Sequence, residues 1–424
     1  MDTLPVFGRS YEPRLVDPLV TESLATAGAV LIEGPRACGK SMTGLNAAAS
    51  YALLDDTDTA DLARVAPAAV LEGSRPRLLD EWPAAPQLWN LVRRRVDRSG
   101  VGQFILTGSA VPADDDTRHT GAGRILRLRL RTKTWQEKTG ATSPGVSLAG
   151  LFDGQSAVTD LDTGMAYEAV LDELVRPGFP ELGGLPPARA QRMLRAYIDE
   201  IARADAPRLA NLRHDPVVMR RLVSAIARST ASDVSYAALA TDVRAVAPAI
   251  TAETVAVYVG VLERLFVVEP QEAWTPELRS RARLRTSPKL HLADPGLAAV
   301  GLGVDATGLA RDPRTAGLLF ESAVVHDVSV LAGLLDGEVR HFRDSNGHEI
   351  DAVVLLPDGR WGAVEVKLGG GEAPEGAASL VTAVRQIDAA SCGEPAFRLV
   401  VTGTGQTYTM TDGTVTCPLA ALRP

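Results

Sequence analysis

Residues 34–41 read GPRACGKS, and this stretch decides the fold class. It fits the pattern GxxxxGK[ST] at every fixed position, after the apolar run AVLIE at 29–33 and before the helix-like run SMTGLNAAA. A strand, a glycine-rich turn and a helix in this order form a loop whose backbone N–H groups face a phosphate. The sequence therefore predicts an α/β domain of the P-loop class, built on a mainly parallel sheet.

Each position of this loop has an expected role. Lys40 is expected to contact the β- and γ-phosphates of ATP and to act in catalysis, and the Ser41 hydroxyl is expected to hold Mg²⁺. The alternative is a plain glycine-rich turn. The residues expected to line the nucleotide site are Gly34, Pro35, Arg36, Ala37, Cys38, Gly39, Lys40, Ser41 and Met42.

The segment RPRLLDEW at 75–82 predicts a buried strand that ends in two carboxylates. Asp80 is expected to hold Mg²⁺, and Glu81 is expected to polarise the attacking water. A glutamate directly after the aspartate is typical of the additional-strand branch of P-loop ATPases, to which AAA-type proteins belong. In the strand QFILTGS at 103–109, Thr107 is expected to sense the γ-phosphate, with an ordinary Thr-Gly-Ser turn as the alternative.

An arginine that neutralises charge on the transferred phosphoryl group is worth roughly 10³–10⁵ in rate. The candidates are Arg36 in the loop itself, and Arg118 and Arg124 in the segment RHTGAGR. The sequence does not choose among them, and Arg124 is carried forward with the nucleotide-site residues.

A second group of ionisable residues lies in EIDAVVLLPDGRWGAVEVKL at 349–368. A hairpin turn at Pro-Asp-Gly places Asp351 opposite Glu365, with Lys367 on the same face. This is the D…ExK arrangement of restriction-endonuclease-like folds, in which Asp351 and Glu365 bind Mg²⁺ and Lys367 assists catalysis. Glu321 is the expected additional metal ligand, and Gln386 is expected to line the site. The alternatives are ordinary charges on an exposed hairpin, or the fold without activity.

Arginine-rich segments predict a nucleic-acid surface. Residues 216–270 contain two short amphipathic helices and the strand-like run FVVEP, which are typical of a winged helix-turn-helix. In an extended strand, arginines at every second position point the same way and form a basic stripe for phosphates. Such rows are Arg279, Arg281, Arg283 and Arg285, and Arg127, Arg129 and Arg131. A solvated or subunit-facing strand is the alternative.

Length and composition set the broad limits. A chain of 424 residues predicts several domains. Those expected are an AAA-type P-loop domain at 1–165, a helical and winged-helix-like region at 166–290, and a small α/β restriction-endonuclease-like domain at 291–424. No apolar run of ~18 residues and no secretory signal are evident, so a cytoplasmic protein without a membrane span is expected. The net charge of −8 confines any nucleic-acid surface to a local patch.

The order of the motifs resembles a widespread prokaryotic family of ATPases. The segments IEGPRACGKS, LLDEWP, FILTGSA, SPKLHLADPGLA, LLFES and EIDAVV…AVEVK carry the resemblance over nearly the whole chain. Proteins of this family pair an AAA-type P-loop domain with a C-terminal domain of unknown function 4143, whose fold is similar to that of nucleases. The resemblance implies ATP and Mg²⁺ as cofactors, bound through Gly34, Gly39, Lys40, Ser41, Asp80 and Glu81.

Two functions fit these observations. The first is an ATPase coupled to DNA through a nuclease-like tail, assembled as a homo-oligomer because AAA-type sites often lie between subunits. The second is an ATP-dependent switch or scaffold whose C-terminal domain is catalytically inactive and binds a protein partner or mediates oligomerisation.

Overall fold

The computed structural model describes residues 10–109, 121–155, 164–210, 215–279 and 281–424, with the side chains of 208 and 210 left out. The contacts divide the chain into two compact units. Unit 1 comprises Met1–Thr132, Asp205–Leu212 and Arg264–Val267, and unit 2 comprises Lys133–Ala204, Arg213–Glu263 and Val268–Pro424.

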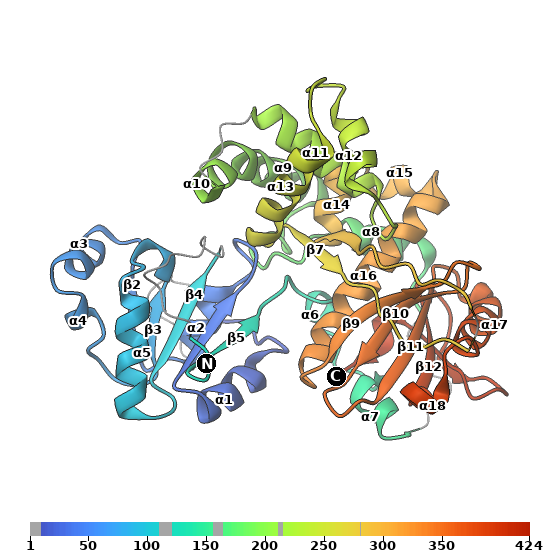
Figure 1. The fold of residues 1–424 in the computed structure, drawn as a ribbon, viewed down its shortest axis with the longest axis horizontal. Helices are drawn as coiled ribbons and strands as arrows, with labels where there is room; N and C mark the ends of the chain where they lie inside the picture. Colours follow the sequence, from blue (N-terminus) through green and yellow to red (C-terminus); the bar gives the residue numbers. More distant parts are fainter. Residues whose placement is uncertain (1–9, 110–120, 156–163, 211–214, 280) are drawn as a thin grey trace. The chain divides into compact units, whose positions relative to one another are not determined.

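Unit 1 is built on a parallel five-stranded sheet in the order β2-β3-β4-β1-β5 (Figure 1). Its strands are β1 (Ala29–Glu33), β2 (Ser50–Leu53), β3 (Arg77–Asp80), β4 (Phe104–Gly108) and β5 (Ile125–Arg129). Because β4 lies between β1, which leads into the phosphate loop, and β3, which ends in the carboxylates, it is the additional strand that the sequence predicted. The prediction of an AAA-type parallel sheet is confirmed.

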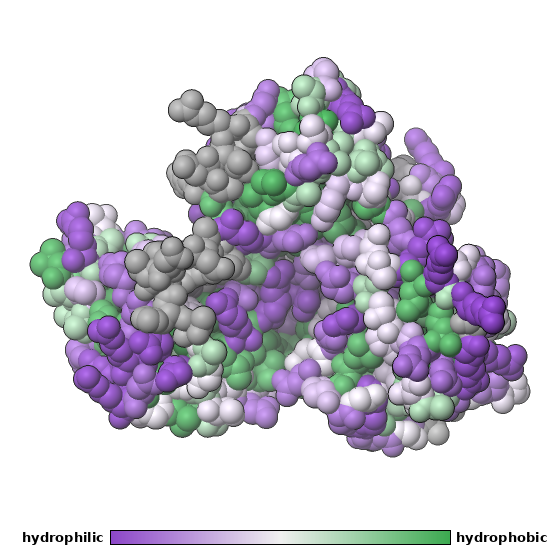
Figure 2. Space-filling model, in the orientation of Figure 1, coloured by the Kyte–Doolittle hydropathy of each residue, from purple (hydrophilic) through white to green (hydrophobic). Residues whose placement is uncertain are grey.

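Helices bury both faces of this sheet, as the alternating apolar side chains of its strands require. Leu31 of β1 packs into a cluster with Trp82 and Trp89, while Val30 and Ile32 pack into a second cluster on the opposite face. On the face drawn in Figure 2, hydrophilic residues gather over α5, whose other side is buried. The helices of unit 1 are α1 (Asp17–Thr26), α2 (Lys40–Ala47), α3 (Thr57–Val65), α4 (Pro67–Val70), α5 (Leu88–Ser99) and α10 (Ala206–Ala210), with a 3₁₀ turn at Trp82–Ala84.

The middle of the chain is helical, as expected. The helices α11, α12 and α13 are followed by an antiparallel pair, β7 (Val268–Gln271) and β8 (Lys289–Leu292). The strand predicted at FVVEP is thus present, at β7. The helices of this region are α8 (Tyr167–Val175), α9 (Pro187–Glu200), α11 (Pro216–Arg228), α12 (Tyr236–Val243), α13 (Ala252–Arg264), α14 (Pro295–Leu302) and α15 (Ala306–Ala310), and a π-helical turn spans Ile201–Asp205.

The C-terminal part of unit 2 is a small α/β domain with a six-stranded sheet in the order β13-β14-β12-β11-β10-β9. Strands β9, β10 and β11 are antiparallel neighbours, whereas β12 runs parallel to β11. The long helix α16 contacts β9, β10 and β11, and α17 contacts β10, β11 and β12 (Figure 1). The bounds are α16 (Pro313–Gly333), β9 (Glu338–Arg343), β10 (Glu349–Leu355), β11 (Trp361–Lys367), α17 (Ala373–Val384), α18 (Ala389–Cys392), β12 (Phe397–Thr402), β13 (Tyr408–Thr409) and β14 (Val415–Pro418).

The expected hairpin between β10 and β11 is confirmed. The backbone N–H of Leu356 donates to the carbonyl oxygen of Arg360, and Gly359 adopts the left-handed conformation that such a loop requires (φ 89°). Ala352 pairs with Val364, so one further step along the register places Asp351 opposite Glu365.

The division into three domains at 165 and 290 remains a prediction, and the structure differs from it at the first boundary. Residues after Thr132 pack with the second unit. In α6 (Trp135–Thr139), the backbone N–H of Trp135 donates to Asp327 of α16 at 2.8 Å. After α7 (Leu148–Phe152) is counted, the short strand β6 (Val146–Ser147) still pairs with β15 (Leu422–Arg423) at the end of the chain. Such long-range contacts leave no trace in the local sequence.

Helix α16 is the one helix in the described part of the chain that is long and apolar enough to cross a membrane by these two criteria. Within the protein, 61% of its most apolar stretch is buried, as expected for the core helix of an α/β domain. The 18-residue test applied to the sequence passes over this helix because polar residues interrupt it.

Candidate functional site

The phosphate loop connects β1 to α2 and has room only for a backbone without side chains at its critical points. A Cβ atom on Gly34 would lie 2.0 Å from the carbonyl oxygen of Leu130, so only glycine fits there. Gly39 takes a left-handed conformation at φ 108° and directly precedes α2. The loop therefore delivers the N-terminus of α2, with its free N–H groups, to the carboxyl edge of the sheet.

Lys40 is held inside this loop. Its side chain is only 5% exposed, and Nζ donates to the carbonyl oxygens of Gly34 at 3.0 Å and Pro35 at 2.8 Å. An ammonium held by two loop carbonyls lies where an anion bound by the loop would meet it. Cys38, by contrast, is fully buried, with Sγ 3.4 Å from the carbonyl oxygen of Leu130, so only its backbone faces the loop.

Three side chains from neighbouring strands form one hydrogen-bonded set at the carboxyl edge. The Ser41 hydroxyl donates to Asp80 Oδ2 at 3.0 Å, and the Thr107 hydroxyl donates to Asp80 Oδ1 at 2.5 Å. Burial raises the pKa of Asp80, while these two hydrogen bonds oppose the shift. A hydroxyl and a carboxylate are the hard oxygen donors that Mg²⁺ prefers, so the donor set fits this ion.

Glu81 is aimed by its own backbone. It adopts a left-handed conformation (φ 52°, ψ 50°), its N–H donates to the Thr107 hydroxyl at 3.0 Å, and Ser109 donates to its carboxylate at 3.3 Å. A non-glycine residue in this conformation is strained, and such strain is concentrated at functional sites. Burial raises the pKa of Glu81, and the charge of Lys40 opposes the shift. Thr107 thus contacts both carboxylate residues, in the place where sequence expected a sensor.

The arginine candidates differ in where the structure places them. Arg36 forms an ion pair with Asp205 at 2.8 Å, and its charge lowers the pKa of Glu81, so it belongs to this neighbourhood. Arg124 precedes β5 at the amino edge of the sheet, opposite to the phosphate loop, and pairs with Asp97 at 2.7 Å. The structure therefore does not bring Arg124 to the loop of its own chain. Arg118 lies outside the described residues.

The expected D…ExK residues converge in unit 2. The backbone N–H of Val366 donates to Asp351 Oδ2 at 2.8 Å, and Lys367 Nζ lies 3.2 Å from Glu365 Oε1. Burial raises the pKa of Glu365 to about 8, and the neighbouring Asp351 adds to the shift. The alternative of ordinary exposed charges does not describe this group, because Glu365 is buried.

Sequence reasoning missed the residue that dominates this cluster. Lys289 of β8 is 1% exposed, and its Nζ lies 2.7 Å from Glu321 of α16 and 2.7 Å from Glu349 of β10. The negative charges of Glu321, Asp351 and Glu349 raise the pKa of Lys289 and keep it protonated. The available signal was a single lysine in the apolar run KLHLA, in a chain that has five lysines and otherwise uses arginine.

Two further expectations at this cluster have clear outcomes. In the described ranges, no group of three His, Cys, Asp or Glu side chains is arranged to hold a metal ion. Gln386 donates to the carbonyl oxygen of Thr382. Gly376 is the residue of α17 that faces Glu365 and Lys367, and ten residues of helix place Gln386 roughly 15 Å further along. The structure does not bring Gln386 to the cluster.

A buried neutral histidine lies beside Lys289. The side-chain amide of Gln271 donates to two backbone carbonyls, so its oxygen accepts from His291 Nε2 at 3.1 Å, while the Ser322 hydroxyl lies 3.0 Å from Nδ1. Burial lowers the pKa of His291 to about 3, and the charge of Lys289 lowers it further, against the opposing effect of Glu269.

This histidine predicts acid sensitivity of unit 2. Because its pKa is depressed on folding, its contribution to stability is complete above pH ~6.5 and is lost as the pH falls towards 3. The variant His291→Gln is expected to flatten the dependence, and the loss between pH 7 and 5 should shrink by on the order of 2 kcal/mol. Urea denaturation at both pH values measures this. Parallel curves for variant and wild type would show that His291 is charged in the folded state.

The predicted arginine rows are partly confirmed in exposure and wrong in secondary structure. Residues 272–288 contain isolated bridges to β9, to Asp344 and to Ile387 rather than a wing strand. Leu278 and Leu284 pack inward. The side chains of Arg279, Arg281, Arg283 and Arg285 are all exposed. In the other row, Arg127 pairs with Glu33 at 2.9 Å, and Arg129 stacks over Phe266.

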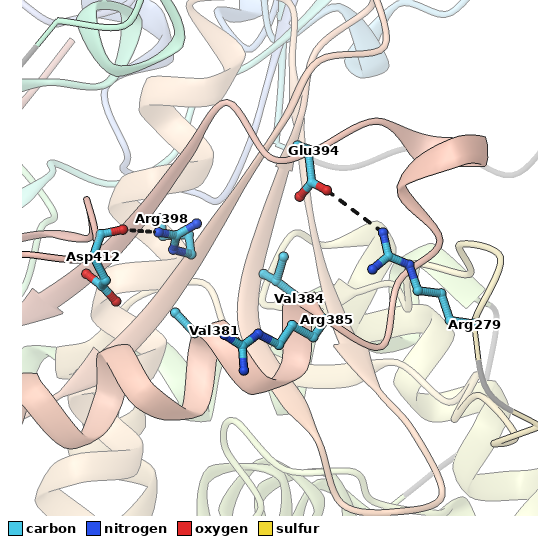
Figure 3. A pocket seen from close by; sticks show the side chains of 7 residues that line it. All are labelled: Arg279, Val381, Val384, Arg385, Glu394, Arg398 and Asp412. Atoms are coloured by element: carbon cyan, nitrogen blue, oxygen red, sulfur yellow. Dashed lines mark hydrogen bonds and ion pairs between the residues drawn. The ribbon is translucent and has the colours of Figure 1, made fainter.

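Arg279 is drawn into a pocket of about 360 Å³ in unit 2 (Figure 3). It lies 3.8 Å from Glu394, and Arg398 across the pocket donates to the backbone oxygen of Asp412. Val381, Val384 and Arg385 of the α17 region complete the lining. Because carboxylates accompany its arginines, this pocket is close to balanced in charge, and Arg279 is less free to contact phosphates than the rest of its row.

The sheet order and the loop define unit 1 as a P-loop domain of the ATPase type, which implies nucleotide binding. Comparison with known families agrees: residues 26–138 match an AAA domain family, 316–422 match a domain of unknown function (DUF4143), and 167–308 match a domain of unknown function (DUF8612). The chain thus combines an N-terminal AAA domain with a C-terminal DUF4143 domain, as its motifs predicted.

The wider comparisons add one structure. A Walker-type ATPase of Pyrococcus abyssi is similar at 14% sequence identity, over 69% of this chain and 96% of that chain, with a TM-score of 0.39. No curated protein matches the chain significantly.

Proposed function

We propose that this protein binds ATP with Mg²⁺ at the phosphate loop and hydrolyses it. The observation that carries the proposal is the hydrogen-bonded set of Ser41, Asp80 and Thr107, with Glu81 held beside it. Gly34 and Gly39 open the loop to the phosphates, and Lys40 exchanges its loop carbonyls for phosphate oxygens. Magnesium, held by Ser41 and Asp80, supplies charge neutralisation on the phosphate oxygens.

The proposed chemistry assigns a proton to a named atom. The Glu81 carboxylate accepts a proton from the attacking water, and its raised pKa brings this base closer to neutral pH. Thr107 positions both carboxylates, and Arg36 adds positive charge near Glu81. Release of inorganic phosphate by the wild type, with Mg²⁺ and with EDTA, tests this. Turnover that is unchanged in EDTA would contradict the assignment of Ser41 and Asp80.

A coupling to nucleic acid is the second element of the proposal. The exposed row Arg281, Arg283 and Arg285 on unit 2 supports it, since guanidinium groups at every second residue match the repeated charges of a phosphate backbone. The row lies on a segment that is tied to the sheet of unit 2, where the backbone N–H of Arg285 donates to the carbonyl oxygen of Arg343. DNA is the expected partner, in a cytoplasmic setting.

Replacing Arg281, Arg283 and Arg285 together by alanine tests this coupling. Each lost phosphate contact weakens binding and reduces the dependence on salt by about one unit of slope. DNA binding at several salt concentrations, and DNA stimulation of ATP turnover, are therefore expected to fall, while basal turnover stays unchanged. The matched control is the triple alanine variant of Arg189, Arg192 and Arg195, which are exposed on α9. Equal losses in both variants would reduce the effect to net charge alone.

The alternative function is an ATP-dependent switch or scaffold with a catalytically inactive C-terminal domain. The buried ion pairs of Lys289 with Glu321 and Glu349 favour it, because they fill the acidic cluster with a protein cation. This alternative predicts that ATP changes the oligomeric state, measured by light scattering, and that alanine at Asp351, Glu365 or Lys367 leaves this change intact.

A further inference from the structure

The acidic cluster of unit 2 gathers side chains from three parts of the fold. Glu321 comes from α16, Glu349 and Asp351 from β10, and Glu365 from β11. The cation among them, Lys289, comes from β8, which pairs with β7 through Lys289 and Gln271. A lysine from the end of the helical region therefore reaches into the sheet of the C-terminal domain.

The residues present do not fit a divalent metal ion. Lys289 Nζ lies 2.7 Å from both Glu321 and Glu349, which is the distance of a charge-assisted hydrogen bond. Asp351 accepts from the backbone N–H of Val366, and Glu365 is paired with Lys367. Each carboxylate that a metal would require thus already has a partner, and no arrangement of three metal-binding side chains exists in the described chain.

We infer that the ammonium of Lys289 takes the position of the divalent cation, so that the C-terminal domain binds no metal ion and cleaves no phosphodiester. The four carboxyl groups Glu321, Glu349, Asp351 and Glu365 are compensated by two ammonium groups, Lys289 and Lys367. The cluster is then an ionic junction that fixes β8 to α16 and β10.

A metal ion cannot simply displace this lysine. Lys289 is 1% exposed, and its backbone is fixed by its pairing with Gln271 and by a bridge to Asp233. Moved aside, its ammonium would stay buried next to a divalent cation and without carboxylate partners, which costs several kcal/mol. The inference rests on unit 2 alone, so it stands or falls separately from ATP hydrolysis in unit 1.

The test is Mn²⁺ binding to the nucleotide-free full-length chain, measured by electron paramagnetic resonance of free Mn²⁺. The wild type is expected to show no site tighter than about 1 mM, because its carboxylates are already paired. The variant Lys289→Met is expected to bind Mn²⁺ at least ~10-fold more tightly, since it frees hard oxygen ligands. Adding Asp351→Asn to this variant should remove the gain.

The matched control is Lys367→Met, which removes the other ammonium of the cluster. It should gain no Mn²⁺ site, because Lys289 remains between Glu321 and Glu349. A wild-type Mn²⁺ site in the micromolar range that Asp351→Asn abolishes would overturn the inference. This comparison uses no variant at Lys289, so it decides the question even if Lys289→Met does not fold.

Discussion

Replacing Glu81 by glutamine is expected to stop ATP turnover while ATP remains bound. The amide preserves the size of the side chain but cannot accept a proton from water, and loss of a positioned general base costs roughly 10²–10⁴ in rate. Binding should persist because the loop and Lys40 contact the phosphates independently of Glu81. Phosphate release under single-turnover conditions and nucleotide retention on a desalting column measure the two properties.

The matched control for this variant is Glu72→Gln, a change of the same chemistry at an exposed glutamate that pairs with Arg95. Its turnover should equal that of the wild type. If Glu81→Gln also retained normal turnover, another group would be the base, and the strained left-handed backbone at Glu81 would need a different explanation.

Replacing Lys289 by methionine is expected to cause the largest loss of stability. Methionine fills nearly the same volume, but it leaves Glu321 and Glu349 buried without their cation. Breaking a buried ion pair by removing one partner lowers the free energy of unfolding by about 3–5 kcal/mol. Urea denaturation at neutral pH, followed by circular dichroism, measures this loss.

Lys367→Met supplies the comparison for this measurement, because it removes an ammonium that is 26% exposed and lies 3.2 Å from Glu365. Solvent screens this pair more strongly, so its loss should be clearly smaller. Equal losses for the two variants would mean that Lys289 is not the central cation of the cluster.

The sequence predicted those features that depend on local spacing. The loop from Gly34 to Ser41 is a continuous segment whose residue types prescribe its backbone, so its geometry was predictable. The pairing of Asp351 with Glu365 followed from counting back from the turn at Gly359, and the register confirms it. The additional strand was implied by the succession of Asp80 and Glu81 and is present as β4.

The sequence did not predict features that depend on distant contacts. Lys289 meets Glu321 and Glu349 from 32 and 60 positions away, and no periodicity records such a meeting. The arginine row at 279–285 reads as a strand by its alternation, yet the segment lies against the sheet through Leu278 and Leu284. Arg124 was assigned from composition alone, although its place before β5 puts it at the amino edge of a parallel sheet.

Calorimetric titration of the full-length chain with ATP and Mg²⁺ tests the central claim most directly. The wild type is expected to bind a single ATP per chain, and Lys40→Ala is expected to abolish the heat of binding, because the buried ammonium at the loop carbonyls is the main cation available to the phosphates. A well-folded wild type that takes up neither ATP nor ADP in the presence of Mg²⁺ would contradict the account.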